Sequence, residues 1–188
     1  MYSMLAVFVM IQIAICWRIF QYVHGIEYTG ATASFLGMTY YTGITGAQLV
    51  GAVVSSGIFA GIGIIYGHEL AHTKGFSFLI ARWMMGLSGS AHFCYAHVYN
   101  HHLELGCEND PATAPRGRSL YAHLPKSHFG QSKFLYTMEK QRLKRLGVPF
   151  LSWQNRWIRG YAMSLPTIAL FWFAGAWTGL ACMALIWL

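Results

Sequence analysis

The chain has 188 residues, of which 55% are hydrophobic and only 10% charged, and its formal net charge is +7. Its length fits one domain. A charged fraction this far below the roughly 25% of soluble domains excludes an ordinary water-soluble protein and favours a membrane protein. The basic charge does not indicate nucleic-acid binding, because loops beside membrane spans are expected to be basic.

The first predicted element is a transmembrane helix at the N-terminus. Residues 2–17 carry no charge, and the long side chain of Arg18 can reach a membrane interface. A signal peptide is the alternative, but no basic segment precedes the apolar run and no clean small-residue cleavage site follows it. We therefore expect a helix that spans the membrane.

Two further stretches, residues 40–67 and 161–188, are also uncharged. As helices, each is long enough to cross a hydrocarbon core of roughly 30 Å. Inside the second stretch, Gly175-Ala176-Trp177-Thr178-Gly179 is either a tight turn between two helices or a set of small residues packed within one. The predicted fold class is all-α, a polytopic transmembrane helical protein.

The segment between the second and third spans carries most of the positive charge. Ten of the thirteen lysines and arginines lie in residues 97–160, whereas residues 24–39 contain only Glu27 as a charged residue. By the positive-inside rule, residues 97–160 are predicted to be cytoplasmic. Within them, residues 108–117 read as a loop, and residues 133–147 as an amphipathic helix that Gly147 ends.

Four cysteines, Cys16, Cys94, Cys107 and Cys182, form no C-x-x-C pair. We expect all four to be reduced, without a disulfide framework or a zinc knuckle.

Five of the nine histidines fall into two tight groups. His68 and His72, in HELAH, lie at helix positions i and i+4, which share one face, so both can bind one metal ion. The second group, HVYNHH, repeats that spacing with His97 and His101. His102 projects about 100° further round a helix and can reach a second ion or the far side of the first. These five histidines are the candidate metal ligands.

HELAH by itself fits a zinc metalloprotease, with Glu69 as general base. Five imidazoles are more than a tetrahedral zinc site with an open position uses, and imidazole suits iron and copper as well as zinc. The protease interpretation leaves HVYNHH unexplained. In an iron site, Glu69 would instead orient a ligand imidazole. Asp110 is expected to cap its loop, and His92 to be a packed histidine.

The two groups lie only 24 residues apart, counting residues 73–96 between them. A hairpin through the bilayer needs about forty residues, and a single crossing would put the groups on opposite sides. Residues 73–96 are therefore predicted to form an interfacial or re-entrant segment.

The order HELAHTKG, AHVYNHH and GCENDPATAPRG resembles the membrane di-iron family of alkane and xylene monooxygenases, within the fatty acid desaturase superfamily. The resemblance covers residues 60–125. It implies one membrane-embedded domain over residues 1–188, in a bacterial inner membrane, with cytoplasmic histidine boxes. It also implies that iron, two ions per complete chain, is bound by His68, His72, His97, His101 and His102.

The activity that the resemblance implies is a hydroxylation. The enzyme would use O2 and external electrons to hydroxylate a terminal or benzylic C–H bond of an n-alkane or alkyl aromatic. The electrons would come from a rubredoxin or a ferredoxin-type donor with its reductase, docking on the basic residues 126–159. Membrane lipid and an apolar substrate are the other implied partners. A desaturase or hydroxylase of lipid acyl chains on the same scaffold is the alternative function.

Two features depart from the family pattern. Many alkane hydroxylases have glutamate just before the second box. This chain has Ala96 there, which is more like the xylene monooxygenase branch. The family also has a lone histidine and a third box of H-x-x-H-H type. Neither appears in this sequence before Leu188. His123 and His128, five residues apart, do not match that box. We therefore expect a fragment, truncated towards its C-terminus.

Overall fold

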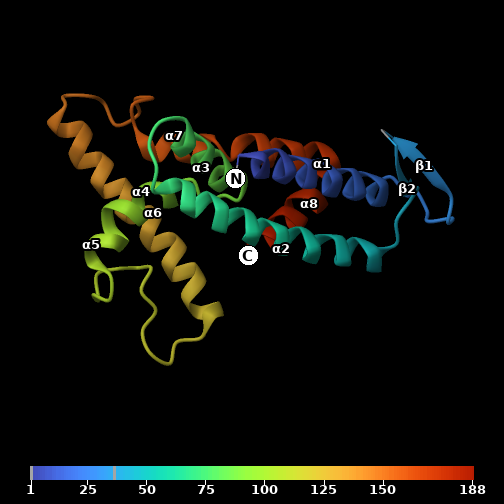
Figure 1. Cartoon of the computed structure of the whole chain (residues 1–188), viewed down its shortest axis with the longest axis horizontal. Helices are drawn as coiled ribbons and strands as arrows, with labels where there is room; N and C mark the ends of the chain where they lie inside the picture. The colour runs from blue at the N-terminus through green and yellow to red at the C-terminus, as the bar shows by residue number, and fades with distance from the viewer. Residues whose placement is uncertain (1, 36) are drawn as a thin grey trace. The chain divides into compact units, whose positions relative to one another are not determined.

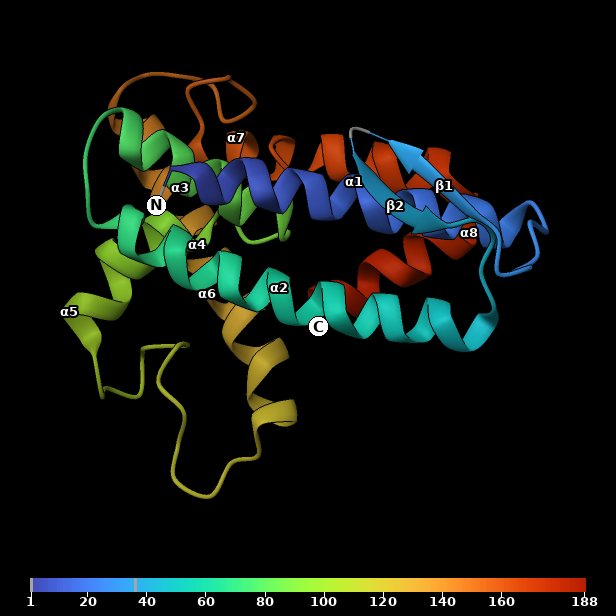
Figure 2. The same cartoon turned by 45° about the vertical axis from the view of Figure 1, so that its right-hand side comes forward.

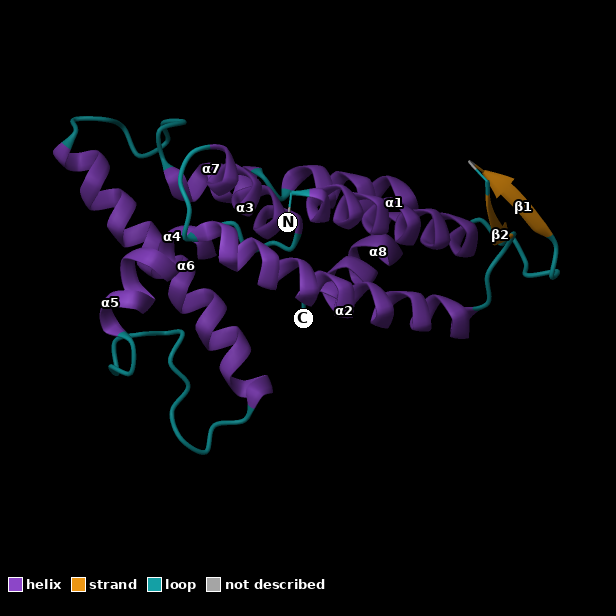
Figure 3. Cartoon of the chain, viewed as in Figure 1, coloured by secondary structure: helices purple, strands orange, loops and turns teal. Residues whose placement is uncertain are grey.

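The computed structural model describes residues 2–35 and 37–188. Helices make up most of it, and one two-stranded sheet is present in the described residues (Figure 3). The chain forms two compact units, Met1–Gly63 with Leu165–Leu188, and Ile64–Ser164. The predicted all-α class is confirmed, with a small hairpin added to it.

Three helical stretches are long and apolar enough to cross a membrane: Ser3–Val23, Gly46–Ala71 and Arg156–Trp187. Each overlaps one of the three uncharged stretches of the sequence, so the three predicted spans are confirmed as long apolar helical segments. They correspond to helix α1 (Ser3–Val23), helix α2 (Gly46–Ala71), and helices α7 (Arg156–Ala162) and α8 (Leu165–Trp187) together.

In the first unit, α1 packs along α8 (Figure 1), and single glycines of α2 contact these two helices. A Cβ atom at Gly63 would lie 3.5 Å from the ring of Phe8, and one at Gly57 would lie 3.8 Å from the backbone of Ile186. Glycines at these positions let side chains of the neighbouring helices pack against the α2 backbone.

Helix α8 reverses direction at Gly175 and Ala176, which have non-helical backbone angles (Figure 2). Ala176 has a positive φ of 45°. A side chain at Gly179 would overlap the carbonyl oxygen of Phe171, so only glycine fits where the chain folds back. Of the two alternatives for residues 175–179, the turn between two helices is confirmed. The third apolar stretch is therefore not one straight span.

Helix α2 begins at Gly46, six residues later than the uncharged stretch suggested. The reason is a capping box: Gln48 donates its backbone N–H to Oγ1 of Thr45 at 3.3 Å, and Thr45 donates its backbone N–H to Oε1 of Gln48 at 3.0 Å. Before it, Thr32–Phe35 (β1) and Met38–Tyr41 (β2) pair antiparallel, with Phe35 opposite Met38. The sequence analysis did not predict this hairpin.

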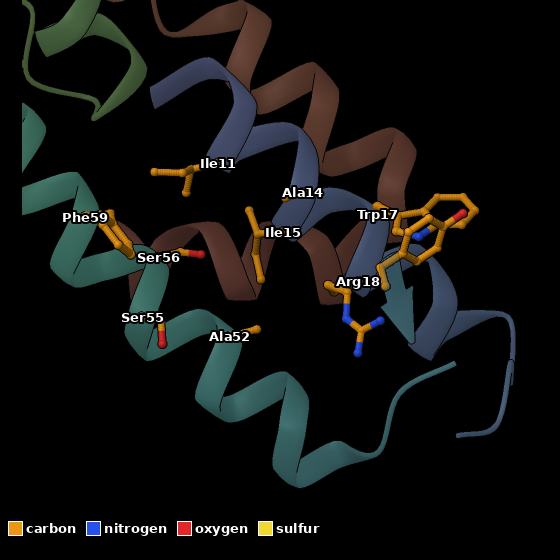
Figure 4. A pocket seen from close by; sticks show the side chains of 10 residues that line it. Ile11, Ala14, Ile15, Trp17, Arg18, Ala52, Ser55, Ser56 and Phe59 are labelled. Carbon is orange, nitrogen blue, oxygen red and sulfur yellow. The ribbon is translucent and has the colours of Figure 1, made fainter. Parts of the chain in front are cut away.

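A hollow of about 420 Å³ lies between α1 and α2 in the first unit (Figure 4). Its walls are largely apolar, from Ile11, Ile15 and Phe59, with Ser55 and Arg18 as polar members. Arg18 is held there because its Nη1 donates to Oε1 of Gln21 and to the carbonyl oxygen of Tyr41.

The second unit contains the end of α2 and six further elements. These are α3 (Phe76–Leu87), α4 (Phe93–Ala96), the π-helix η1 (His97–His101), α5 (His102–Glu104), α6 (Leu120–Arg145) and α7. Helix α3 has 12 residues, about 18 Å, which is too short to cross a bilayer. The interfacial or re-entrant placement of residues 73–96 stays a prediction.

Helix α6 starts thirteen residues before the predicted residue 133, because Ser119 caps its first turn by accepting from the backbone N–H of Ala122 at 3.3 Å. It ends at Arg145, two residues before the predicted Gly147, where φ is +67°. The fully buried carboxylate of Glu139 ties α6 to α7: it accepts from the side chain of Arg142 at 2.7 and 2.8 Å and from the backbone N–H of Arg156 at 2.9 Å.

Candidate metal centre

The first histidine box lies on the last turns of α2. His68 and His72, one α-helical turn apart, have their Nε2 atoms 3.5 Å from each other. The remote ring nitrogen of His68, Nδ1, lies 3.2 Å from Oε1 of Glu69. The expected shared face is therefore present, and Glu69 contacts the side of the ring that points away from the other histidines.

The second box lies on a backbone that the sequence analysis did not anticipate. Residues His97–His101 form a π-helical turn between α4 and α5. A π turn pairs residues i and i+5. His97 and His102, five positions apart, consequently face each other, with their Nε2 atoms 3.0 Å apart. In a regular α-helix, His102 would instead have projected away from His97.

The Nε2 atom of His97 is the centre of the cluster. It lies 2.8 Å from Nε2 of His68, 3.3 Å from Nε2 of His72 and 3.0 Å from Nε2 of His102. One ring nitrogen carries at most one proton, so hydrogen bonds cannot account for three such neighbours. A metal ion bound by His68, His72 and His97 would account for the close approach of their ring nitrogens.

The spacing fits a transition-metal ion. Imidazole nitrogens at about 2.1 Å from one ion lie about 3.0 Å apart at right angles and about 3.4 Å apart in a tetrahedron. The ligand atoms of His68, His72 and His97 all lie within 4.8 Å of one another. The donors are all imidazole nitrogens, which suit iron, copper and zinc but not magnesium or calcium.

Burial and the neighbouring histidines keep His97 neutral. Burial is the largest cause, followed by the positive charge that His68, His102, His72 and His101 would carry, and together they lower the pKa of His97 to about 3. Metals bind neutral imidazole, so His97 is in its ligand form at neutral pH. His97 is buried, whereas His72 and His102 are exposed, which leaves one side of the cluster open.

His101 faces a buried carboxylate. Its Nδ1 lies 2.6 Å from Oδ2 of Asp110, while its ring stacks on that of His97 with the ring centres 5.3 Å apart. Asp110 also accepts from the hydroxyl of Thr113 at 2.5 Å and from the backbone N–H of Ala112 at 2.9 Å. Its contact with Nδ1 leaves Nε2 of His101 available to a metal.

The loop that carries Asp110 is fixed against α6. A Cβ atom at Gly130 would overlap the ring of Pro111, so the glycine lets that ring lie directly on the helix. Sequence reasoning gave Asp110 a role in its loop, which the contacts with Ala112 and Thr113 confirm, but it missed the contact with His101. The signal available for it was a single aspartate before proline, close behind a histidine box.

The remaining histidines lie outside this cluster. His92 is buried against the rings of Tyr161 and His128, so the prediction of a packed histidine is confirmed. Nε2 of His123 lies 3.2 Å from the carbonyl oxygen of Ala112, and Nδ1 of His24 lies 2.9 Å from that of Phe20. The four cysteines are free, as expected.

Comparison with known proteins gives consistent matches. The sequence profile described as "Fatty acid desaturase" matches residues 45–188. Alkane 1-monooxygenase 2 of Pseudomonas aeruginosa is 34% identical over 136 residues, which cover 69% of this chain and 35% of that protein. Alkane 1-monooxygenase of Acinetobacter baylyi is 32% identical over 112 residues, 59% of this chain and 28% of that protein. The chain thus spans about a third of the length of these relatives.

Proposed function

The chain belongs to the fatty acid desaturase family, and we propose that it forms the histidine-box part of a membrane-bound, iron-dependent alkane monooxygenase. The relatives that match it carry the name alkane 1-monooxygenase. The observation that carries the proposal is the grouping of His68, His72 and His97, whose ligand nitrogens all lie within 4.8 Å of one another, with Nε2 of His102 a further 3.0 Å from that of His97.

In this proposal all five boxed histidines bind iron. His68, His72 and His97 offer ligand nitrogens to one shared point, His102 lies against His97, and His101 offers its Nε2 on the far side of its contact with Asp110. Iron bound there would supply the activation of O2 that inserts one oxygen atom into a C–H bond. The complete protein would hold two iron ions. This ligand set remains a proposal, supported by geometry and by family.

The protein's own contribution is to fix the rings and their protons. Asp110 contacts Nδ1 of His101, and Glu69 contacts Nδ1 of His68. Each contact places the ring proton on Nδ1, so the lone pair of Nε2 is directed to the metal. Burial of His97 excludes water from one side of the cluster. The open side, at His72 and His102, is where further ligands, O2 and substrate can approach.

We propose an n-alkane or an alkyl aromatic as substrate, hydroxylated at a terminal or benzylic carbon. The apolar spans are a suitable environment for such a molecule, and the names of the relatives favour the alkane. Electrons come from a rubredoxin or a ferredoxin-type protein, for which the basic segment 126–159 is the proposed docking region. The protein lies in the bacterial inner membrane with the cluster on the cytoplasmic side.

A zinc protease is not favoured. Its general base must face the water that the metal binds, but the carboxylate of Glu69 contacts Nδ1 of His68, on the side remote from the cluster. The cluster also contains His97 and His102, for which a protease built on HELAH has no use.

The test is made on the complete gene product in lipid nanodiscs, supplied with rubredoxin and its reductase. We expect O2-dependent hydroxylation of an n-alkane, bound iron measured by mass spectrometry, and loss of both in His68→Ala. The matched control is His123→Ala, which lies outside the cluster and should keep its iron. Iron retained in His68→Ala, His101→Ala and His102→Ala alike would contradict the ligand set.

Product analysis separates the proposed function from its alternative. Alkanes, alkyl aromatics and fatty acyl substrates are offered in parallel. An alcohol from an alkane or alkyl aromatic supports the monooxygenase. An unsaturated or hydroxylated acyl chain as the main product would assign the site to lipid modification.

A further inference from the structure

A second hollow, of about 400 Å³, lies in the Ile64–Ser164 unit. Its walls come from residues 71–75, which include the last residue of α2 and the four that follow it, and from Phe78, Tyr95, Tyr99 and Arg156. His72 stands at one edge, but the other metal-cluster histidines do not line it. The hollow combines aromatic rings with the cations Lys74 and Arg156, a lining that suits an anion with an apolar part.

The guanidinium of Arg156 is held over aromatic rings, and its ion pair with Glu139 is long. It lies over the rings of Tyr95 and Tyr99, 5.1 and 5.9 Å from their centres. Its closest carboxylate is that of Glu139, with Nε 3.9 Å from Oε1, and the side chain of Arg142 already binds that carboxylate with two hydrogen bonds. Among the described residues, the side chain of Arg156 makes no hydrogen bond, so its donors are available to a ligand.

Arg82 adds a buried positive charge beside the same wall. Its guanidinium lies 5.5 Å from the centre of the Tyr95 ring, and the residue is only 9% exposed. Its Nε has no hydrogen-bond partner among residues 2–35 and 37–188. A buried cation without a counterion is unfavourable, so Arg82 raises the attraction of this region for an anion.

The surroundings place the hollow at a membrane surface. Residues 71–75 follow the candidate span Gly46–Ala71, and Arg156 begins the candidate span Arg156–Trp187. The ends of spans lie in the lipid headgroup layer. Helix α3 starts just after Lys74 and exposes Leu79 and Trp83, one turn apart on one face, as interfacial helices do. The anion of that layer is the phosphate of a phospholipid.

We propose that this hollow binds the phosphate of an anionic phospholipid. Arg156 donates to the phosphate with two parallel N–H groups, and Lys74 adds a second positive charge. Leu79 and Trp83 contact the acyl chains. The bound lipid would hold residues 71–75, which carry His72, against the membrane surface. This inference depends on the membrane location of the chain and not on the proposed iron chemistry.

The test counts bound lipids by native mass spectrometry on the purified complete protein in neutral detergent. Phosphatidylglycerol and phosphatidylcholine are titrated separately. We expect at least one phosphatidylglycerol to be retained with about tenfold preference over phosphatidylcholine. The double variant Lys74→Gln/Arg156→Gln should weaken it about tenfold or more, at roughly 1 kcal/mol per basic residue.

The matched control is Lys140→Gln/Arg145→Gln, which removes the same charge from exposed positions of α6. It should change the affinity less than twofold, by our order-of-magnitude expectation for charges away from a site. The single variant Lys74→Gln removes one charge instead of two and is the milder substitution. Circular dichroism checks that each variant is folded. Equal loss in both double variants would mean non-specific attraction and overturn the proposal.

Two competitors separate the sources of the anion. Inorganic phosphate at millimolar concentration should not displace the lipid; displacement would assign the hollow to a free anion. An acidic rubredoxin is the second competitor. If the Lys74→Gln/Arg156→Gln variant kept its lipid and lost rubredoxin binding, the hollow would belong to a protein partner and the lipid proposal would be wrong.

Discussion

The two histidine boxes place their side chains by different means. The first uses a regular α-helix, where the i and i+4 spacing of His68 and His72 is enough to bring two imidazoles to one face. The second needs a π turn, which shifts the register so that His97 meets His102. A histidine pattern therefore defines a site only together with the backbone register under it.

The two boxes also differ in how they are supported. Glu69, next to His68 in sequence, is an exposed carboxylate with its side chain 61% accessible. Asp110, which supports His101, has a fully buried side chain, and its loop lies against α6. The first box is therefore local, whereas the second depends on segments that are distant in sequence.

The largest effect is expected from His97→Ala. Nε2 of His97 joins both boxes, so its removal should abolish iron binding, a greater loss than the 10–100-fold typical of groups behind a ligand. Iron per protein, measured by mass spectrometry, checks this. His24→Ala, outside the cluster, is the control. Equal iron in wild type and His97→Ala would show that the two boxes do not share a metal.

An alanine inserted after Val98 tests the register of the π turn directly. The insertion puts His97 and the former His102 six positions apart, a spacing that neither an α-helix nor a π turn brings to one face. We expect iron binding to fall nearly as far as in His97→Ala. Val98→Ala keeps the chain length and should bind iron normally. An insertion variant with normal iron content would rule out a role for the register.

Asp110→Asn and Glu69→Gln compare the supports of the two boxes. Burial raises the pKa of Asp110, but hydrogen bonds from Thr113, Ala112 and His101 outweigh burial and leave that pKa below its usual value. The buried, charged Asp110 should matter more: we expect Asp110→Asn to lower iron affinity about 10–100-fold. Glu69→Gln should cost only about twofold, because the carboxylate is exposed. Iron titration of both variants measures the two affinities. A larger loss of affinity in Glu69→Gln than in Asp110→Asn would contradict the stronger role of Asp110.

The smallest effect on iron concerns His92, whose packing supports the segment before the second box. Burial, and then the neighbouring His128, lower the pKa of His92 to about 3. In the unfolded chain the pKa is near 6.5, so the unfolded state takes up the proton first as the pH falls. Metal-free protein should therefore lose stability between about pH 6.5 and pH 3, by a few kcal/mol in total.

His92→Phe retains an aromatic ring and removes the titration. We expect its melting temperature to vary less between pH 7 and about pH 4 than that of the wild type, while its iron content at neutral pH is unchanged. His24→Phe, at an exposed histidine, should behave as the wild type does. An unchanged pH profile in His92→Phe would assign the acid sensitivity to other histidines.

Much of this protein could be predicted from its residues. Uncharged stretches of sufficient length gave the three apolar segments, because a helix is the conformation that satisfies backbone hydrogen bonds inside a membrane. HELAH and HVYNHH gave the candidate ligands, because histidines at positions i and i+4 of a helix lie on one face and can bind one metal ion. Gly147 gave the end of α6, where a positive φ is required.

Other features were decided only by tertiary structure. The reversal at Gly175 and Ala176 depends on tertiary contacts, because the sequence of this stretch is equally compatible with one continuous helix. The π turn is invisible to a pattern of period 3.6, since its extra residue is accommodated by packing. The contact of Asp110 with His101 arises because Gly130 lets a loop lie on a distant helix. Local spacing thus determined which residues can bind a metal, while long-range packing decided which of their nitrogens meet.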